Sequence, residues 1–313
     1  MYLLKHLRIL IFAAFIVTLL GYPRLFAGQA KKIVQQRYWF IYSGQDSLLI
    51  KQLIGRLEEN IISIEDFFRH KSSAVITIYV TRSETEYYKY ASRAVPEWSQ
   101  AVAFPAKNLV VLKIISAEDV IESARILLHE LVHINLAGRL HGKQVPLWLN
   151  EGLAQYLSGD LLTFDDKIVL ANALVTRKIL SFAAIDSLQK FSKVKARLAY
   201  IQSKSAVEFF VGRHGLDRLQ LLISNSAGYR SINDAFKKTV GYDALDFEIF
   251  WYSDLKERYA WMIILNLDSL IWISMGGLAI TAIIVIRYRN RKKLRHWKET
   301  EDDDDDQDQI AVL

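Results

Sequence analysis

ILLHELVHINLAGRLHGKQVPLWLNEGLAQYL, at Ile126–Leu157, contains an H-E-x-x-H pattern followed by N-E-G. If the first part of this stretch is helical, His129 and His133 lie one turn apart on the same face. Two imidazoles at this spacing can hold one zinc ion, whose ligand atoms lie at about 2.0–2.3 Å. The carboxylate of Glu130, next to the first histidine, can take a proton from a zinc-activated water. A catalytic zinc needs a third protein ligand, and Glu151 is our candidate.

The context of the pattern favours a metal site over an amphipathic helix with two surface histidines. Residues 126–136 are almost wholly apolar outside the motif, and polar groups buried in such a helix must be paired or bound to a ligand. We expect Gly138 to end this helix and Pro146 to begin a second one, which carries Glu151. The two helices would then bring the expected ligands together.

HELVH followed by PLWLNEGLAQYL resembles the peptidase MA-like gluzincins, zinc peptidases whose third ligand is a glutamate on a following helix. The resemblance implies a zincin-like fold, zinc as the cofactor and a protein or peptide as the substrate. It also implies that His129, His133 and Glu151 are the ligands and that Glu130 is the general base. It covers roughly residues 38–259, although its specific motifs occupy only about thirty residues.

The W-L-N-E-G-L-A segment also resembles the aminopeptidase N group, from which the chain departs in two ways. Seventeen residues separate His133 from Glu151, one fewer than we expect for that group. The group has an upstream G-x-M-E-N segment that binds the free amino end of the substrate, whereas residues 102–108 read VAFPAKN and contain no glutamate. Internal cleavage is therefore better supported than trimming of amino ends.

Three further residues are candidates for supporting roles. AYIQS at residues 199–203 resembles the family's stretch after the zinc helices, and Tyr200 is the candidate hydrogen-bond donor to the developing oxyanion. The alternative is a tyrosine half buried at a helix interface. Gln155, one turn after Glu151, could accept a hydrogen bond from a ligating histidine, although we would expect an acid there. Asn150 could instead orient a ligand or a substrate carbonyl, and both residues are equally well explained as polar residues at a helix end.

Composition narrows the possible classes of protein. A chain of 313 residues, 51% of them apolar, can bury one sizeable core and still supply membrane segments. The absence of cysteine excludes disulfides and thiolate ligands, so a zinc site must consist of histidines and carboxylates. Because we find no sustained basic face with interleaved aromatic residues, we expect no nucleic-acid partner.

The two ends of the chain predict a membrane-anchored protein. Residues 1–27 have the layout of a secretory signal peptide, although an uncleaved anchor is the alternative. Residues 269–286 are apolar apart from Ser274 and Thr281, and the span predicted there, residues 267–287, is long enough to cross a bilayer core of about 30 Å. The arginines and lysines that follow predict a cytoplasmic carboxyl end. The predicted location is the cell membrane, with one span and with the peptidase domain periplasmic or on the cell surface.

Residues 288–313 form the predicted cytoplasmic tail. Its first part is basic and suited to contact with anionic lipid. The acidic run at residues 301–306 is expected to be solvated and disordered.

Residues 31–262 are expected to form one gluzincin domain of the α+β class. A small mixed sheet should lie beside the motif helix, and the second half should be mostly helical. Residues 101–105 could be an edge strand, which in the resembling family binds extended peptide, or an ordinary loop. Strands are expected at 37–42, 74–80 and 108–114, and helices at 47–70, 84–91, 164–175, 195–214, 216–225, 231–240 and 242–259.

Two functions fit these observations. One is a membrane-anchored zinc metallopeptidase, and the other is a non-catalytic, membrane-tethered interaction or assembly module that kept the fold and the metal. The second is motivated by the weak set of hydrogen-bond partners that the sequence predicts for the expected ligands. The intact Glu130 favours the first, because a purely structural zinc site does not need it.

Overall fold

The structure is a computed structural model, in which the chain forms two compact units. The first consists of Met1–Leu162 and Leu180–Ile249, and the second of Thr163–Ile179 and Phe250–Leu313. The expected signal peptide, residues 1–27, lies outside the described residues, and the bounds of the expected domain remain a prediction. The described residues are 30–69, 74–91, 95, 99–259 and 267–310.

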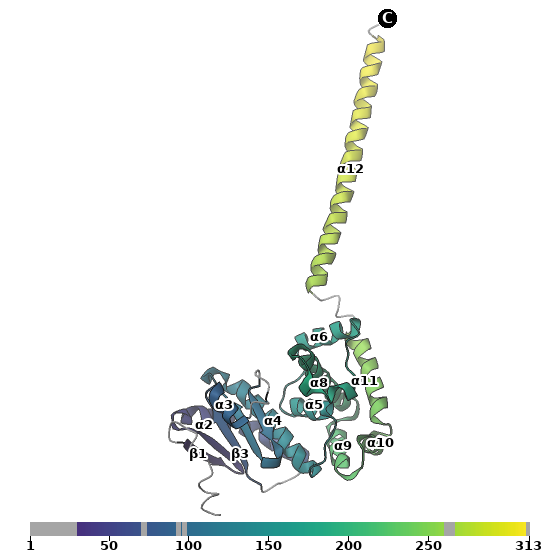
Figure 1. Ribbon diagram of the computed structural model, residues 1–313. Helices are drawn as coiled ribbons and strands as arrows, with labels where there is room; N and C mark the ends of the chain where they lie inside the picture. The colour runs from purple at the N-terminus through teal and green to yellow at the C-terminus, as the bar shows by residue number, and fades with distance from the viewer. Residues whose placement is uncertain (1–29, 70–73, 92–94, 96–98, 260–266, 311–313) are drawn as a thin grey trace, which may run out of the picture. The chain divides into compact units, whose positions relative to one another are not determined.

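The first unit contains a five-stranded sheet in the order β1-β2-β3-β5-β4. The outer pairs, β1 with β2 and β4 with β5, are antiparallel, whereas β2, β3 and β5 run parallel. This confirms the predicted small mixed sheet (Figure 1). Of the two alternatives for residues 101–105, an edge strand or a loop, the structure has the edge strand at residues 101–104. The strands are β1 (Ala30–Gln35), β2 (Tyr38–Ser43), β3 (Ile76–Thr81), β4 (Ala101–Phe104) and β5 (Leu109–Lys113).

Helices make up most of the rest of the first unit, in agreement with the predicted α+β class. The helices are α2 (Ser47–Phe68), α3 (Glu84–Ala91), α4 (Val120–Leu140), α5 (Leu147–Leu157), α7 (Phe182–Ile185), α8 (Lys193–His214), α9 (Leu216–Gly228), α10 (Ile232–Val240) and the first part of α11 (Ala244–Tyr259). Short 3-10 helices occur at Gly44–Asp46, Pro105–Lys107, Ala117–Asp119 and Leu188–Lys190.

The two faces of the sheet are covered differently. Phe40, Ile78 and Val110 alternate with their neighbours along the parallel strands and are fully buried, on the face where α2 and α4 pack. The opposite face is covered by the shorter α3, whose Tyr87 packs against Val111. The motif helix α4 is therefore held directly against the sheet.

An aromatic cluster holds the helices around the first turns of α5. Trp148 is buried and stacks on Phe182 with ring centroids 4.2 Å apart, and Phe247 lies on it at 5.6 Å. Phe210 and Phe236 complete the cluster. Aromatic side chains bury large areas, so this packing fixes where α5 starts relative to α8.

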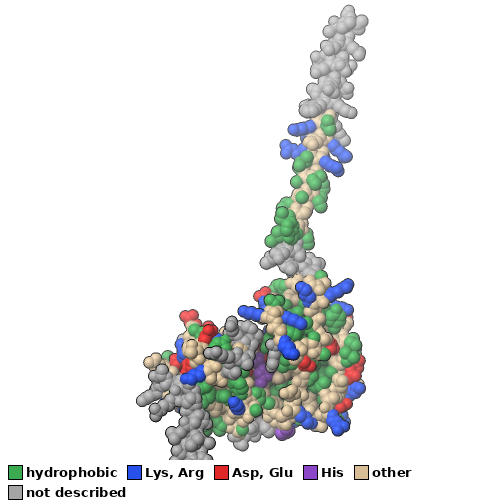
Figure 2. All heavy atoms as spheres, in the orientation of Figure 1, with side chains coloured by type: hydrophobic (Ala, Val, Ile, Leu, Met, Phe, Trp, Pro, Cys, Tyr) green, Lys and Arg blue, Asp and Glu red, His purple; other side chains and the backbone are tan. Residues whose placement is uncertain are grey.

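The second unit contains α6 (Phe164–Val175), the second part of α11, and α12 (Leu267–Ile310). Within α12, Ile271–Leu294 is long and apolar enough to cross a membrane, with a mean hydropathy of 1.8, and it overlaps the predicted span at residues 267–287. Figure 2 shows apolar side chains along the first part of this helix and lysine and arginine side chains along the next part.

Two local predictions were wrong. The acidic run at residues 301–306, expected to be disordered, lies within α12, because the sequence contains neither proline nor glycine after Gly277 to interrupt a helix. Gly138 does not end α4, which continues to Leu140. The left-handed C-cap falls on His141 (φ 51°), whose N–H bonds to the carbonyls of Ala137 and Gly138.

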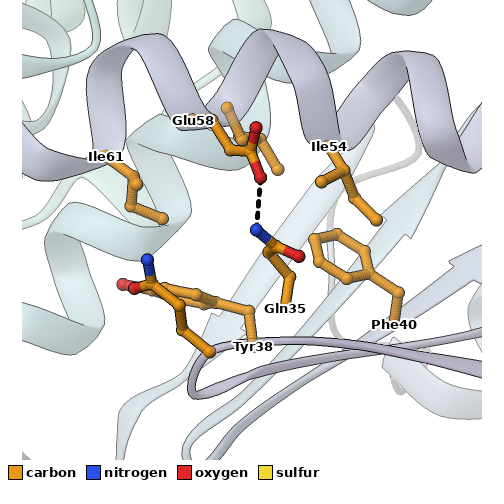
Figure 3. A pocket seen from close by; sticks show the side chains of 8 residues that line it. Gln35, Tyr38, Phe40, Ile54, Glu58 and Ile61 are labelled. Atoms are coloured by element: carbon orange, nitrogen blue, oxygen red, sulfur yellow. Dashed lines mark hydrogen bonds between the residues drawn. The ribbon is translucent and has the colours of Figure 1, made fainter.

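A small pocket lies between the β1–β2 turn and α2 (Figure 3). Its lining is largely apolar, and Gln35 donates a hydrogen bond to Glu58 across it. Two of its polar side chains are therefore paired with each other. It contains none of the predicted site residues.

Candidate metal centre

Helix α4 positions the two motif histidines. It is anchored by a row of fully buried apolar side chains, including Leu127, Leu131 and Val132. Its start is preceded by a 3-10 turn capped by Ser116, whose side chain accepts a hydrogen bond from the N–H of Glu118. The helix thus holds its polar motif face in a fixed orientation.

The side chains of His129, His133 and Glu151, which we call the metal cluster, converge from α4 and α5. The Nε2 atoms of the two histidines are 3.1 Å apart. The Oε2 atom of Glu151 lies 3.4 Å from His129 Nε2 and 3.7 Å from His133 Nε2. The side chains are 13–19% exposed, so the cluster is largely buried and still open to solvent. Figure 2 shows histidine side chains at the surface of the globular part of the protein.

These distances fit a metal ion. Ligand atoms about 2.0–2.2 Å from a tetrahedral zinc ion lie roughly 3.3–3.6 Å from one another. The three atoms of the metal cluster form a triangle with sides of 3.1, 3.4 and 3.7 Å, close to this size, and together they could hold a metal ion. Two imidazoles and one carboxylate also leave a tetrahedral ion one further position, as a catalytic site requires.

His129 and Glu151 shift each other's pKa in opposite directions. Burial lowers the pKa of His129, but the hydrogen bond to Glu151 and its charge outweigh burial, so the pKa is raised overall. Burial raises the pKa of Glu151, but the charge of His133 and the hydrogen bond to His129 outweigh it, so this pKa is lowered overall. The raised pKa favours the cationic form of His129, and the lowered pKa favours the carboxylate form of Glu151, so each group stabilises the opposite charge on the other.

Asn150 lies beside the metal cluster. Its Oδ1 atom is 2.8 Å from His133 Nδ1, so the ring nitrogen is placed to donate a hydrogen bond to the amide oxygen. A proton on Nδ1 leaves the lone pair of Nε2 directed towards Glu151 and His129. Such a hydrogen bond typically fixes the tautomer and orientation of a ligating histidine. This geometry matches one of the two roles considered for Asn150.

Gly152 allows α5 to approach α8 closely. A Cβ atom at this position would lie 2.2 Å from the backbone oxygen of Ser203 and 2.7 Å from Val207 Cγ2. The start of α5 is held separately, because the N–H of Leu147 donates to Oδ1 of Asp186, at the end of α7, at 2.8 Å. The N-E-G segment thus combines the carboxylate of Glu151 with the one residue type that permits this packing.

Gln155 and Tyr200 also lie at the contact between α5 and α8. Gln155 does not take the histidine partner considered above. Its Nε2 atom donates to the backbone oxygens of Glu151 (3.3 Å) and Tyr200 (3.1 Å). Burial, followed by the charges of Glu151 and Glu130, raises the pKa of the Tyr200 phenol. The phenol therefore keeps its proton and lies within electrostatic reach of both carboxylates.

The family comparison agrees with this geometry. A family model described as the peptidase MA superfamily matches residues 58–257, which is more than half of the chain. The chain belongs to the peptidase MA superfamily. Members of this superfamily are generally metal-dependent, and a peptidase family implies a peptide substrate. A comparison with curated proteins found no match.

Around this peptidase MA site, an ion-pair network links three elements. The carboxylate of Asp160 contacts Arg125 Nη1 on α4 at 3.1 Å and Lys204 Nζ on α8 at 2.8 Å. Sequence reasoning missed this network, although one signal was present. Lys204 is a charged residue within Ile201–Val207, a wholly buried segment, and a buried lysine requires a paired acid.

Proposed function

We propose that the protein is a membrane-anchored zinc metallopeptidase that cleaves internal peptide bonds of extracytoplasmic proteins or peptides. One observation carries this proposal. The Nε2 atoms of His129 and His133 and the Oε2 atom of Glu151 converge at 3.1–3.7 Å, beside Glu130, in a chain of the peptidase MA superfamily.

The residues of the metal cluster and those beside it would have separate chemical roles. His129, His133 and Glu151 would hold the zinc ion. When bound, zinc polarises a carbonyl and lowers the pKa of a water molecule. The carboxylate of Glu130 accepts the proton that the attacking water loses and passes it to the leaving amine. The protonated phenol of Tyr200 donates a hydrogen bond to the oxygen on which negative charge develops.

The substrate would lie along β4. This strand is at the edge of the sheet and packs against α4, which carries the histidines and Glu130. An edge strand can pair with the backbone of an extended peptide. The VAFPAKN segment at residues 102–108 has no glutamate to bind a free amino end, which supports internal cleavage.

The membrane helix supports the proposed location. Ile271–Leu294 could span a membrane, and its exposed basic side chains, such as Arg287 and Lys292, follow the apolar part. Basic residues next to a span favour the cytoplasmic side. The peptidase unit would then lie on the opposite side, where it meets extracytoplasmic substrates.

The test is peptide turnover by the purified full chain in detergent. With zinc present, the wild type should cleave members of an unstructured peptide library, and a chelator should abolish cleavage. Glu130→Gln should lower kcat by about 100- to 10,000-fold, the usual contribution of a general base, while zinc content stays unchanged. Glu122→Gln is the matched control, because Glu122 is an exposed residue of the same helix, and it should keep activity near that of the wild type.

Two outcomes would reject the enzyme. Cleavage that persists after chelation and in Glu130→Gln would show that another activity is being measured. Stoichiometric zinc without turnover of any peptide, together with a stably co-purifying protein, would instead support a non-catalytic zinc-binding module.

A further inference from the structure

The ladder between β4 and β5 determines which backbone groups of β4 face the open edge of the sheet. The N–H of Lys113 donates to the oxygen of Gln100 at 2.7 Å, so Gln100 points towards β5. In an antiparallel pair, successive residues point their N–H and C=O groups alternately towards the partner and away from it. The register therefore directs the backbone groups of Ala101 and Ala103 towards the edge.

Of these two residues, Ala101 already accepts a hydrogen bond from its own chain. Ser99 Oγ donates to the oxygen of Ala101 at 2.7 Å. The Tyr87 hydroxyl lies 3.0 Å from Ser99 Oγ. Because the single hydroxyl proton of Ser99 is directed at Ala101, the phenol is the donor to Ser99. Three groups thus form a chain of hydrogen bonds that ends on an edge-facing carbonyl.

The chain of hydrogen bonds starts from a buried tyrosine of α3, on the opposite face of the sheet from α4. Tyr87 is fully buried. Burial raises the pKa of Tyr87 to about 12, with the bond to Ser99 opposing the shift and the negative charge of Glu130 adding to it. The phenol is therefore a permanent donor that lies within electrostatic reach of Glu130.

The two edge-facing residues also differ in how much of each is exposed. Ala101 is only 7% exposed, whereas Ala103 is half-buried. We propose that Ser99 is a positioning residue that sets the register in which a substrate peptide pairs with β4, because its hydroxyl uses one of the two lone pairs of the buried Ala101 carbonyl and leaves Ala103 as the better placed pairing residue. This inference rests on the proposed peptidase function.

The experiment uses the peptide that the full-length wild type cleaves best. It is compared with a series of the same peptide in which one backbone N–H at a time is replaced by an ester oxygen. In the wild type, KM should rise for the ester that removes the bond to Ala103, and the ester two residues away, opposite Ala101, should have no effect. In Ser99→Ala, KM should also rise for the ester opposite Ala101, because that carbonyl is now available to the substrate. KM for the unmodified peptide should also fall by about two- to tenfold, the effect of one net hydrogen bond.

Two further variants separate this role from a general structural one. Ser99→Thr keeps the hydroxyl and should reproduce the wild-type ester series. Tyr87→Phe removes the donor that holds Ser99 and should give the Ser99→Ala pattern with smaller changes in KM. If Ser99→Ala does not fold, as judged by thermal denaturation, Tyr87→Phe provides the same test.

The outcomes distinguish this inference from the proposed function. Identical ester series in the wild type and both Ser99→Ala and Tyr87→Phe, with cleavage intact, would overturn the role of Ser99 and leave the peptidase in place. Absence of cleavage by the wild type would overturn the peptidase and this inference together.

Discussion

Helix α4 contributes to two polar clusters whose donors and acceptors are balanced differently. In the first, which we call the Arg37 cluster, Arg37 donates to Asn135 Oδ1 on α4 at 2.7 Å and to Glu65 Oε1 at 2.9 Å. Tyr38 donates to the same oxygen of Glu65 at 2.6 Å. Each charged group in this cluster has a partner of opposite charge or a hydrogen-bond partner. In the metal cluster, by contrast, two ring nitrogens, whose roles depend on protonation, and one carboxylate oxygen face one another at 3.1–3.7 Å.

The comparison shows that burial of polar groups does not by itself mark a functional site. The Arg37 cluster is complete without any further atom, and it ties β2 and α2 to the motif helix. The metal cluster brings lone pairs together, which is unfavourable unless a proton or a cation lies between them. The balance of donors and acceptors therefore separates a structural cluster from one that calls for a ligand.

The largest expected effect comes from removing one member of the metal cluster. His133→Ala should weaken zinc binding by more than about 100-fold, because losing a ligand must exceed the 10- to 100-fold cost of losing a supporting hydrogen bond. Asn135→Ala, two residues along the same helix, should leave zinc affinity within a few-fold of wild type. Competition with a chromophoric chelator measures both. Equal zinc affinities for the two variants would remove the distinction between the clusters.

Breaking the Arg37 cluster should affect stability instead of metal binding. Arg37→Met removes the charged partner of Glu65 and the Arg37 donor to Asn135 Oδ1, and it should lower the free energy of unfolding by about 2–3 kcal/mol. This is less than for a fully buried pair, because the side chains of Arg37 and Glu65 are 14% and 27% exposed. Denaturant unfolding gives the value, and zinc stoichiometry should stay at one. Loss of zinc from the folded variant would contradict the assignment of separate roles.

The metal cluster should also depend on the fit between α5 and α8. Gly152→Ala forces a methyl group against the backbone of Ser203 and should cost about 1–3 kcal/mol of stability, with weaker zinc binding because Glu151 is displaced. Gly212→Ala is the matched control, since its Cβ would meet nothing within 4 Å. It should be neutral or stabilise α8 by about 0.5–1 kcal/mol. Similar unfolding curves for both variants would show that the close approach is not required.

The smallest expected effect concerns Asn150. Asn150→Ala removes the acceptor from His133 Nδ1 and should weaken zinc binding by about tenfold, at the lower end for such a hydrogen bond. Asn150→Asp keeps an acceptor and should bind zinc at least as tightly as the wild type. The same chelator competition applies. A folded Asn150→Ala chain with wild-type zinc affinity would mean that the ring of His133 is held by packing alone.

Local patterns were enough to predict most of the fold and the members of the metal cluster. The four-residue spacing of His129 and His133 specifies one helical face, and Pro146 marks the start of the helix that carries Glu151. Predicted helices and strands agree with the structure to within a few residues at most ends. These features depend on the period of apolar residues and on helix-end signals, which are local properties of the chain.

Apart from the two local errors, at Gly138 and at residues 301–306, the features that were missed join separate elements of the chain. β1 carries lysines and exposed positions, and it is recognisable only from its pairing with β2. The contact of Gly152 with Ser203 spans some fifty residues, and no pattern around Gly152 indicates which backbone lies against it. The contact of Ser99 with Tyr87 likewise depends on the packing of α3 against the sheet.

The first turns of α5 place three consecutive residues in three different environments. Asn150 meets His133, Glu151 completes the metal cluster, and Gly152 lies against the backbone of α8. Successive residues of a helix are rotated by about 100°, so a slip of one position would break all three arrangements at once. An insertion or deletion within this turn should therefore disrupt all three contacts together, and not weaken them one at a time.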